Sequence, residues 1–188
     1  MAHDRGRAAD DLGSGRSAGD THSGPLPGPV VGALADRLKE RIYATITMIA
    51  VVVGLSVGDA GTTGALATVL TTALGLWLAA FVADQQAHRT VHRHLATGHD
   101  LRRMLYVSSP LLSCAVGPAV MIVLAALDVL DLSTSLMVAA GVGVASLFAW
   151  GCAGGLRMGG GVLLAVMAGL ADAVIGVAVA LVKAAAGH

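Results

Sequence analysis

The chain has 188 residues, of which 55% are hydrophobic and only 13% are charged, and its formal net charge is zero. A soluble domain is about a quarter charged. The composition therefore excludes an ordinary water-soluble globule and indicates a membrane protein. A neutral chain gives no reason to expect nucleic acid as a partner. The two cysteines, Cys114 and Cys152, lack CxxC spacing and predict no disulfide framework.

Residues 1–35 are rich in Gly, Ser, Ala, Asp and Arg and have no early apolar core of the kind that a signal peptide needs. Such a segment buries too little apolar surface to fold, so we expect a disordered cytoplasmic tail that ends in a proline-rich linker. The membrane domain is predicted over 36–188. An amphipathic run at 31–41 predicts a lead-in helix along the membrane surface.

Continuous apolar stretches dominate the rest of the chain. A helix needs about 20 apolar residues to cross a hydrocarbon core of about 30 Å. Stretches near this length lie at 42–57, 63–83, 111–130, 133–150 and 161–182. They are continuously apolar rather than alternating, which excludes a β-barrel. We therefore predict an all-α bundle of five transmembrane helices, with a kink at Pro118 in the third.

Basic residues predict the orientation of this bundle. With the N-terminus inside, every link on the inner side carries arginine, whereas the outer links carry only acidic charges. The inner basic residues are Arg37, Lys39, Arg41, Arg89, Arg93, Arg102, Arg103 and Arg157, and the outer acidic ones are Asp59, Asp128 and Asp131. The prediction is a cytoplasmic N-terminus and an outside C-terminus.

Small residues recur at every fourth position of the fifth span, at Gly161, Ala165, Gly169 and Ala173. This spacing favours close helix packing. Gly141 and Ala145 offer a similar face in the fourth span. The alternative is that a high Ala and Gly content alone produces such pairs.

The segment DQQAHRTVHRHLATGHD, at 84–100, holds four of the seven histidines and lies in a predicted cytoplasmic loop over 84–104. If the second span continues as a helix, Asp84, His88 and His92 share one face. They would make a ligand set for a divalent transition metal, whereas His94 would lie on another face. The alternative is a hydrated, basic loop.

Asp172 lies near the middle of the fifth span. A charge there costs about 2.5–3.5 kcal/mol on insertion scales, so such residues often serve proton or cation transfer. The alternative is a protonated side chain that is hydrogen-bonded to a neighbouring helix.

Three segments carry a family resemblance: ERIYATITMIAVVVGLS, LGLWLAAFVADQQAH, and the run from ASLFAWGCAGG to ALVKAAAGH. They resemble a group of uncharacterised actinobacterial integral membrane proteins. A more distant resemblance, in plan only, is to the vacuolar iron transporter family. It implies five spans, an inside N-terminus and a metal-binding insertion between spans two and three. That family's insertion is rich in glutamates and its first span carries an acidic residue, whereas 84–104 hold no glutamate and 42–57 no acid.

Two functions follow from these features. The first is a small cation or metal transporter in the plasma membrane, acting as a homo-oligomer within the lipid bilayer. The second is a non-transporting scaffold or accessory subunit. No catalytic constellation is visible, so we do not expect an enzyme.

Overall fold

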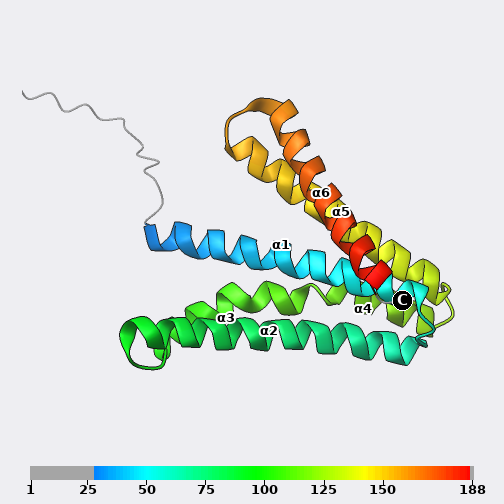
Figure 1. Cartoon of the computed structure of the whole chain (residues 1–188), viewed down its shortest axis with the longest axis horizontal. Coiled ribbons are helices and arrows are strands. Elements are labelled where there is room, and N and C mark those ends of the chain that lie inside the picture. Colours follow the sequence, from blue (N-terminus) through cyan, green and yellow to red (C-terminus); the bar gives the residue numbers. More distant parts are fainter. Residues whose placement is uncertain (1–27, 187–188) are drawn as a thin grey trace, which may run out of the picture.

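The computed structural model describes residues 28–186, and these residues form α-helices joined by short links (Figure 1). The helices are α1 (Gly28–Val57), α2 (Thr62–His92), α3 (Gly98–Ser113), α4 (Val116–Ala126), α5 (Leu132–Arg157) and α6 (Gly161–Ala186). The third and fourth are two halves of one apolar stretch. The chain thus has five segments long and apolar enough to cross a membrane, which confirms the predicted all-α, five-span fold.

Successive spans run antiparallel because the links between them are short. In Figure 1 the α2–α3 turn and the beginning of α1 lie at one end of the bundle, and the C-terminal end of α6 lies at the other. The α5/α6 hairpin leans away from α2 and α3 towards the α5–α6 turn. The arginines at the start of α1 and around the α2–α3 turn therefore gather at one end, as the charge pattern predicts.

The first helix begins earlier than expected. Residues 28–35, assigned to the disordered tail, form the first turns of α1, and the expected surface helix at 31–41 is continuous with the span. Pro29 permits this start, since a missing N–H costs nothing in the first turn of a helix. The 30 residues of α1 measure about 45 Å, so the helix extends beyond the hydrocarbon core. The tail over 1–27 lies outside the described residues.

The predicted loop over 84–104 is largely helical. The second helix continues to His92, and α3 begins at Gly98. Arg93 ends α2 in the left-handed conformation, with φ of 62°, and its N–H bonds to the Arg89 carbonyl. The Gln85 side chain then fixes the returning chain, because its Oε1 accepts from the Ala96 N–H at 3.1 Å.

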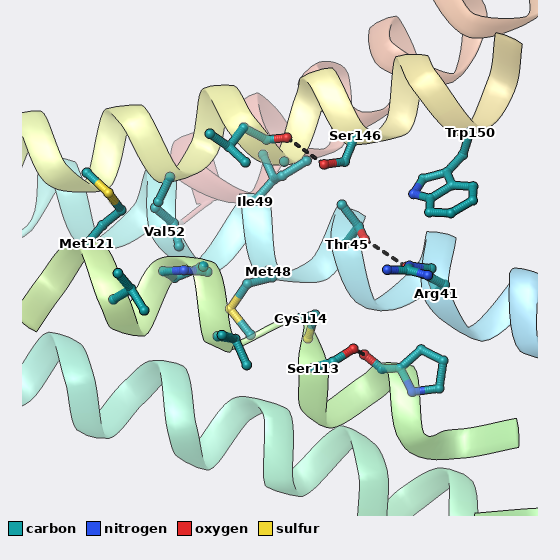
Figure 2. A pocket seen from close by; sticks show the side chains of 18 residues that line it. Arg41, Thr45, Met48, Ile49, Val52, Ser113, Cys114, Met121, Ser146 and Trp150 are labelled. Atoms are coloured by element: carbon teal, nitrogen blue, oxygen red, sulfur yellow. Dashed lines mark hydrogen bonds between the residues drawn. The ribbon is translucent and has the colours of Figure 1, made fainter. Parts of the chain in front are cut away.

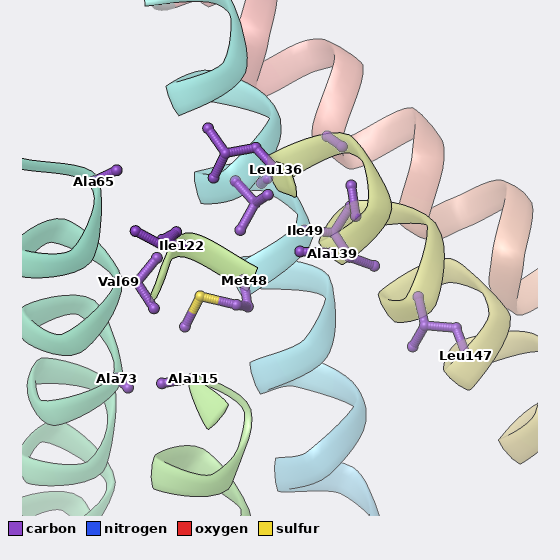
Figure 3. Close-up of a cluster of buried hydrophobic side chains, with 14 residues drawn as sticks. Met48, Ile49, Ala65, Val69, Ala73, Ala115, Ile122, Leu136, Ala139 and Leu147 are labelled. Atoms are coloured by element: carbon purple, nitrogen blue, oxygen red, sulfur yellow. The ribbon is translucent and has the colours of Figure 1, made fainter. Parts of the chain in front are cut away.

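The core lies where α1, α2, α4 and α5 meet (Figure 3). Met48 and Ile49 of α1 are 3% exposed and occupy its centre. Small α2 side chains at every fourth position, Ala65, Val69 and Ala73, let α4 approach on one side. Large apolar side chains cover much of the outer surface, as expected where a helix faces lipid rather than water.

The two last helices pack through glycines. A Cβ on Gly151 would lie 2.6 Å from the Gly169 Cα, and one on Gly155 would collide with the Ala165 backbone. The predicted small-residue face of the fifth span therefore packs within the chain, with Ala165 and Gly169 buried. Gly141 and Ala145 of the fourth span are exposed and take no part in packing within the chain, where α5 packs on α6 through Gly151 and Gly155.

Candidate functional site

The third membrane segment is interrupted between Ser113 and Val116, and two prolines explain why. Pro118 has no N–H, so the Cys114 carbonyl four residues earlier loses its helical partner. Pro118 itself falls in the first turn of α4, where a missing N–H is tolerated. Cys114 and Ala115, between the two helices, keep right-handed helical dihedrals, so the predicted kink appears as a local interruption of the helical hydrogen bonds, about one turn before the proline.

Side chains add hydrogen bonds to carbonyls just before this break. The Ser113 hydroxyl donates to the Pro110 carbonyl at 3.0 Å, and the Cys114 thiol donates to the Leu111 carbonyl at 2.9 Å. Pro110 frees a further carbonyl, that of Tyr106. It accepts from the Arg37 guanidinium at 3.1 Å and from the Ser109 hydroxyl at 2.9 Å. The Arg37 side chain also lies 4.1 Å from the Tyr106 ring centre, which ties α3 to α1.

A cavity of about 430 Å³ lies beside the break, between α1, the α3–α4 junction and α5 (Figure 2). Carbonyls that lose their helical hydrogen bonds at membrane depth are tolerated only where they are buried in protein or line a cavity. Arg41 and Trp150 lie at one end of the cavity, and Val52 and Met121 lie towards the other. The Arg41 guanidinium stacks 4.5 Å from the centre of the Trp150 ring.

The lining is apolar with one charge. Its hydrophobic surface comes from valine, isoleucine, methionine, glycine and proline, and Arg41 is the single charged residue among the described residues that line it. Both Met48 and Met121 contribute flexible thioethers, which adapt to irregular contents. The geometry suits a small apolar or amphipathic molecule, since ligand pockets of about 300–1,000 Å³ are mostly apolar with a few polar groups.

The predicted metal residues lie together at the basic end of the bundle. Asp84, His88 and His92 do share one face of α2 and line a second hollow of about 490 Å³, with residues of α1 and α3. The ring centres of His88 and His92 are 4.4 Å apart, and the buried Nε2 of His88 has no hydrogen-bond partner.

A further histidine joins this pair. The left-handed turn at Arg93 brings the His94 ring centre to 5.2 Å from His88 and 5.9 Å from His92. The prediction that His94 lies on another face was therefore wrong, and we call His88, His92 and His94 the histidine cluster. In residues 28–186, however, no three His, Cys, Asp or Glu side chains are arranged to hold a metal ion.

The hollow also holds charges that the sequence analysis did not place there. Three carboxylates, Asp36, Glu40 and Asp100, face it from α1 and α3. Lys39 and Arg103 line it as well, so the surroundings are of mixed charge rather than simply basic.

Asp172 lies half-buried in the α5/α6 interface. Its Oδ2 occupies the space beside Gly151, 2.6 Å from where a Cβ of that residue would stand. It is not among the residues that line the cavity at the break. The absence of a side chain at Gly151 is what makes room for the carboxylate.

The cavity was missed by the sequence analysis. The available signal was the pair of prolines eight residues apart, Pro110 and Pro118, within one apolar stretch. Comparison of the chain with family models, curated proteins and solved structures finds no match. Of the two resemblances, the structure supports the five-helix membrane architecture.

Proposed function

We propose that this protein binds a small apolar or amphipathic molecule inside the bilayer, as a multi-pass carrier. The observation that carries the proposal is the cavity beside the interrupted third span. Broken helices at membrane depth line binding sites in many carriers, because their ends supply unpaired backbone groups beside a cavity. We place the N-terminus in the cytoplasm and the protein in the plasma membrane, on the charge pattern of the links.

This ligand class differs from the cation or metal ion that the sequence analysis expected as cargo. No carboxylate of the described residues lines the cavity, and its one charge is the cation Arg41. A metal or alkali ion would meet repulsion there without compensation. Asp172, the carboxylate proposed for an ion path, belongs to a different interface.

Filling the cavity tests the proposal. Gly117 lines it and has open space where a Cβ would stand, so Gly117→Leu adds a large side chain at the cavity wall without a backbone collision. Gly75→Leu is the matched control, since Gly75 is also an exposed helical glycine with open space but lies on α2. The probe is 1-aminoanthracene, a neutral fluorophore, titrated against the purified protein. Its binding is followed by energy transfer from Trp150 in a Trp77→Phe background.

We expect saturable energy transfer in the parent and in Gly75→Leu, and its loss in Gly117→Leu. Equal binding by all three proteins would contradict the proposal. That result would favour the second reading, a membrane scaffold or accessory subunit without a ligand of its own.

A metal function is a second candidate, and the observation that favours it is the histidine cluster. Imidazole nitrogens are common ligands of divalent transition metals. Titration with Zn²⁺, Fe²⁺, Mn²⁺ and Ni²⁺ would compare the parent with His88→Ala/His92→Ala and His94→Ala. The control is His99→Ala, since the His99 side chain is 91% exposed.

Binding that is lost in the double variant and weakened in His94→Ala would support a metal site built on the cluster. Loss in the double variant alone would favour the Asp84, His88 and His92 set. Equal binding by all four proteins would exclude both.

Oligomerisation stays a proposal and needs a surface other than the small-residue face of α6, which α5 already covers. Apolar side chains near the start of α6, such as Val162 and Leu163, are more than 70% exposed, at 73% and 76%. Mass measurement of the detergent-purified protein would decide between lipid and a second copy as their neighbour.

A further inference from the structure

The cavity has spare hydrogen-bond donors at one end only. The Thr45 hydroxyl donates to the Arg41 carbonyl at 2.8 Å, and the Ser146 hydroxyl donates to the Val142 carbonyl at 2.8 Å. The hydroxyl of Ser113 and the thiol of Cys114 are likewise used within their own helix. Along most of its length the cavity therefore offers a ligand dispersion contacts and no new donor.

Arg41 is the exception. Its guanidinium is exposed and stacks on Trp150, and within residues 28–186 no carboxylate forms an ion pair with it. The neighbouring acid, Glu40, lies 3.9 Å from Lys39 instead. Since guanidinium groups bind phosphate and carboxylate oxygens through several N–H donors at once, this end of the cavity is complementary to an anion.

The length of the cavity matches one leaflet of a bilayer. From Arg41 to Val52 the lining follows α1 over roughly 16 Å, at about 1.5 Å per helical residue. The hydrocarbon core is about 30 Å thick, so one leaflet accounts for about 15 Å. A ligand with its anionic group at Arg41 would thus place an apolar chain of leaflet length beside the helix break.

The cavity is also continuous with the lipid-facing surface. Val116 and Val120 of α4 and Val142 of α5 line it while being 60%, 53% and 59% exposed. These side chains face outward at membrane depth, where the bilayer supplies the surrounding molecules. Entry from the side, without passage through water, is therefore open to a lipid chain.

We propose that the cavity holds one acyl chain of an anionic phospholipid, with its phosphate at Arg41. This inference rests on the proposed function and names its ligand class. A zwitterionic phospholipid has the same chain and the same phosphate, but Arg41 would repel its quaternary ammonium, so the net charge of the headgroup is the property that the site selects.

Native mass spectrometry of the whole protein tests the inference with two lipids of identical chains, phosphatidylglycerol and phosphatidylcholine. We expect the parent to retain phosphatidylglycerol about fivefold better, the factor that one basic residue near a membrane surface contributes. Arg41→Gln should abolish this preference, and Arg41→Lys should keep most of it because the charge remains. Lys39→Gln is the control, since it removes a neighbouring charge that does not line the cavity.

The outcomes separate the two proposals. If Gly117→Leu lowers retention of both lipids but Arg41→Gln leaves their ratio unchanged, the cavity binds ligand and the anionic headgroup is overturned. If Lys39→Gln removes the preference as fully as Arg41→Gln, the selectivity belongs to the basic surface and the inference fails. If Gly117→Leu changes nothing, the cavity itself is not the site.

A free fatty acid that displaces phosphatidylglycerol at equal concentration would identify a carboxylate as the ligand and overturn the phospholipid assignment.

Discussion

The α5/α6 hairpin and the interrupted third span are both rich in small residues, yet they use them in opposite ways. In the hairpin, Gly151 and Gly155 meet Gly169 and Ala165 so closely that no Cβ fits between the helices. At the break, Gly117 has nothing within 4 Å of the place where its Cβ would stand. One set of glycines closes an interface and the other leaves room beside it.

Proline makes the difference between the two regions. The hairpin helices contain none, so their small faces stay in register over several turns and pack. Pro110 and Pro118 interrupt the register of the third span and shift α4 relative to α3. Small residues without a matching partner then line a cavity. Spacing of small residues alone therefore does not predict close packing, because backbone continuity is also needed.

The largest expected effect is on the closed interface. Gly155→Leu drives a side chain into the backbone at Ala165. Helical backbone cannot move aside as the end of a flexible side chain can. We expect a loss of about 3 kcal/mol in the free energy of unfolding, at the upper end of overpacking costs. Thermal unfolding in detergent measures it. Gly154→Leu is the control, because the neighbouring Gly154 has open space. Equal Tm values for the two variants would show that the hairpin is not tightly packed.

A smaller effect is expected at the break. Pro118→Ala restores an N–H that the Cys114 carbonyl can accept, which favours a continuous helix. The Tm should stay the same or rise, while binding of 1-aminoanthracene weakens several-fold because the cavity narrows. Pro29→Ala is the control, since Pro29 lies in the first turn of α1, where the N–H has no partner in any case. Unchanged binding in Pro118→Ala would mean that the cavity does not depend on the break.

The sequence predicted the spans well because their signal is simple. Each is a continuous apolar run, and the links between the runs alternate between basic and acidic charge along the chain. The position of the break was harder to predict, because a proline removes the hydrogen bond of the carbonyl four residues earlier and not one at its own position. Pro118 predicts a kink in this span, and the structure places it about one turn earlier, at Cys114 and Ala115.

The histidine cluster shows the same limit on a smaller scale. The periodicity of α2 predicts that Asp84, His88 and His92 share a face. The arrival of His94 depends on a left-handed residue that is not glycine, Arg93, and such a turn has no reliable signature in sequence. Likewise, spacing within the predicted span favoured Gly141 and Ala145 as a packing face, whereas α5 packs on α6 through Gly151 and Gly155, which lie beyond the predicted end of that span.

Asp172→Asn separates the hairpin from the cavity. The Asp172 side chain lies at Gly151 in the α5/α6 interface and does not line the cavity, so we expect binding of 1-aminoanthracene to stay unchanged. The Tm should rise slightly, because an amide costs less than a carboxylate inside the membrane. The same fluorescence titration and melting curves measure both. Weakened binding would instead show that the hairpin and the cavity are coupled, and would return Asp172 to the site as the sequence analysis proposed.

The smallest effect is expected at Asp131, in the link that joins the broken span to the hairpin. Its carboxylate caps α5 by accepting from the Thr134 N–H at 2.8 Å, and this bond lowers the pKa of Asp131 below its usual range. A lowered pKa in the folded state contributes stability above the usual carboxylate pKa of about 3.9, and that contribution is lost as the pH falls through the folded value. Asp131→Ala should therefore lower the Tm slightly at neutral pH and not at all in strong acid.

Asp131→Asn sharpens this last test, because asparagine caps a helix about as well as aspartate but does not titrate over this range. Its Tm at neutral pH should equal that of the parent. In acid, the variant should lack the fall in Tm that titration of Asp131 causes in the parent. Asp59→Ala is the control. Asp59 is also an exposed aspartate in a link, but Gly61, not Asp59, is the N-cap residue of α2. If Asp59→Ala and Asp131→Ala lower the Tm equally and with the same pH dependence, the cap at Asp131 is not the cause of the effect.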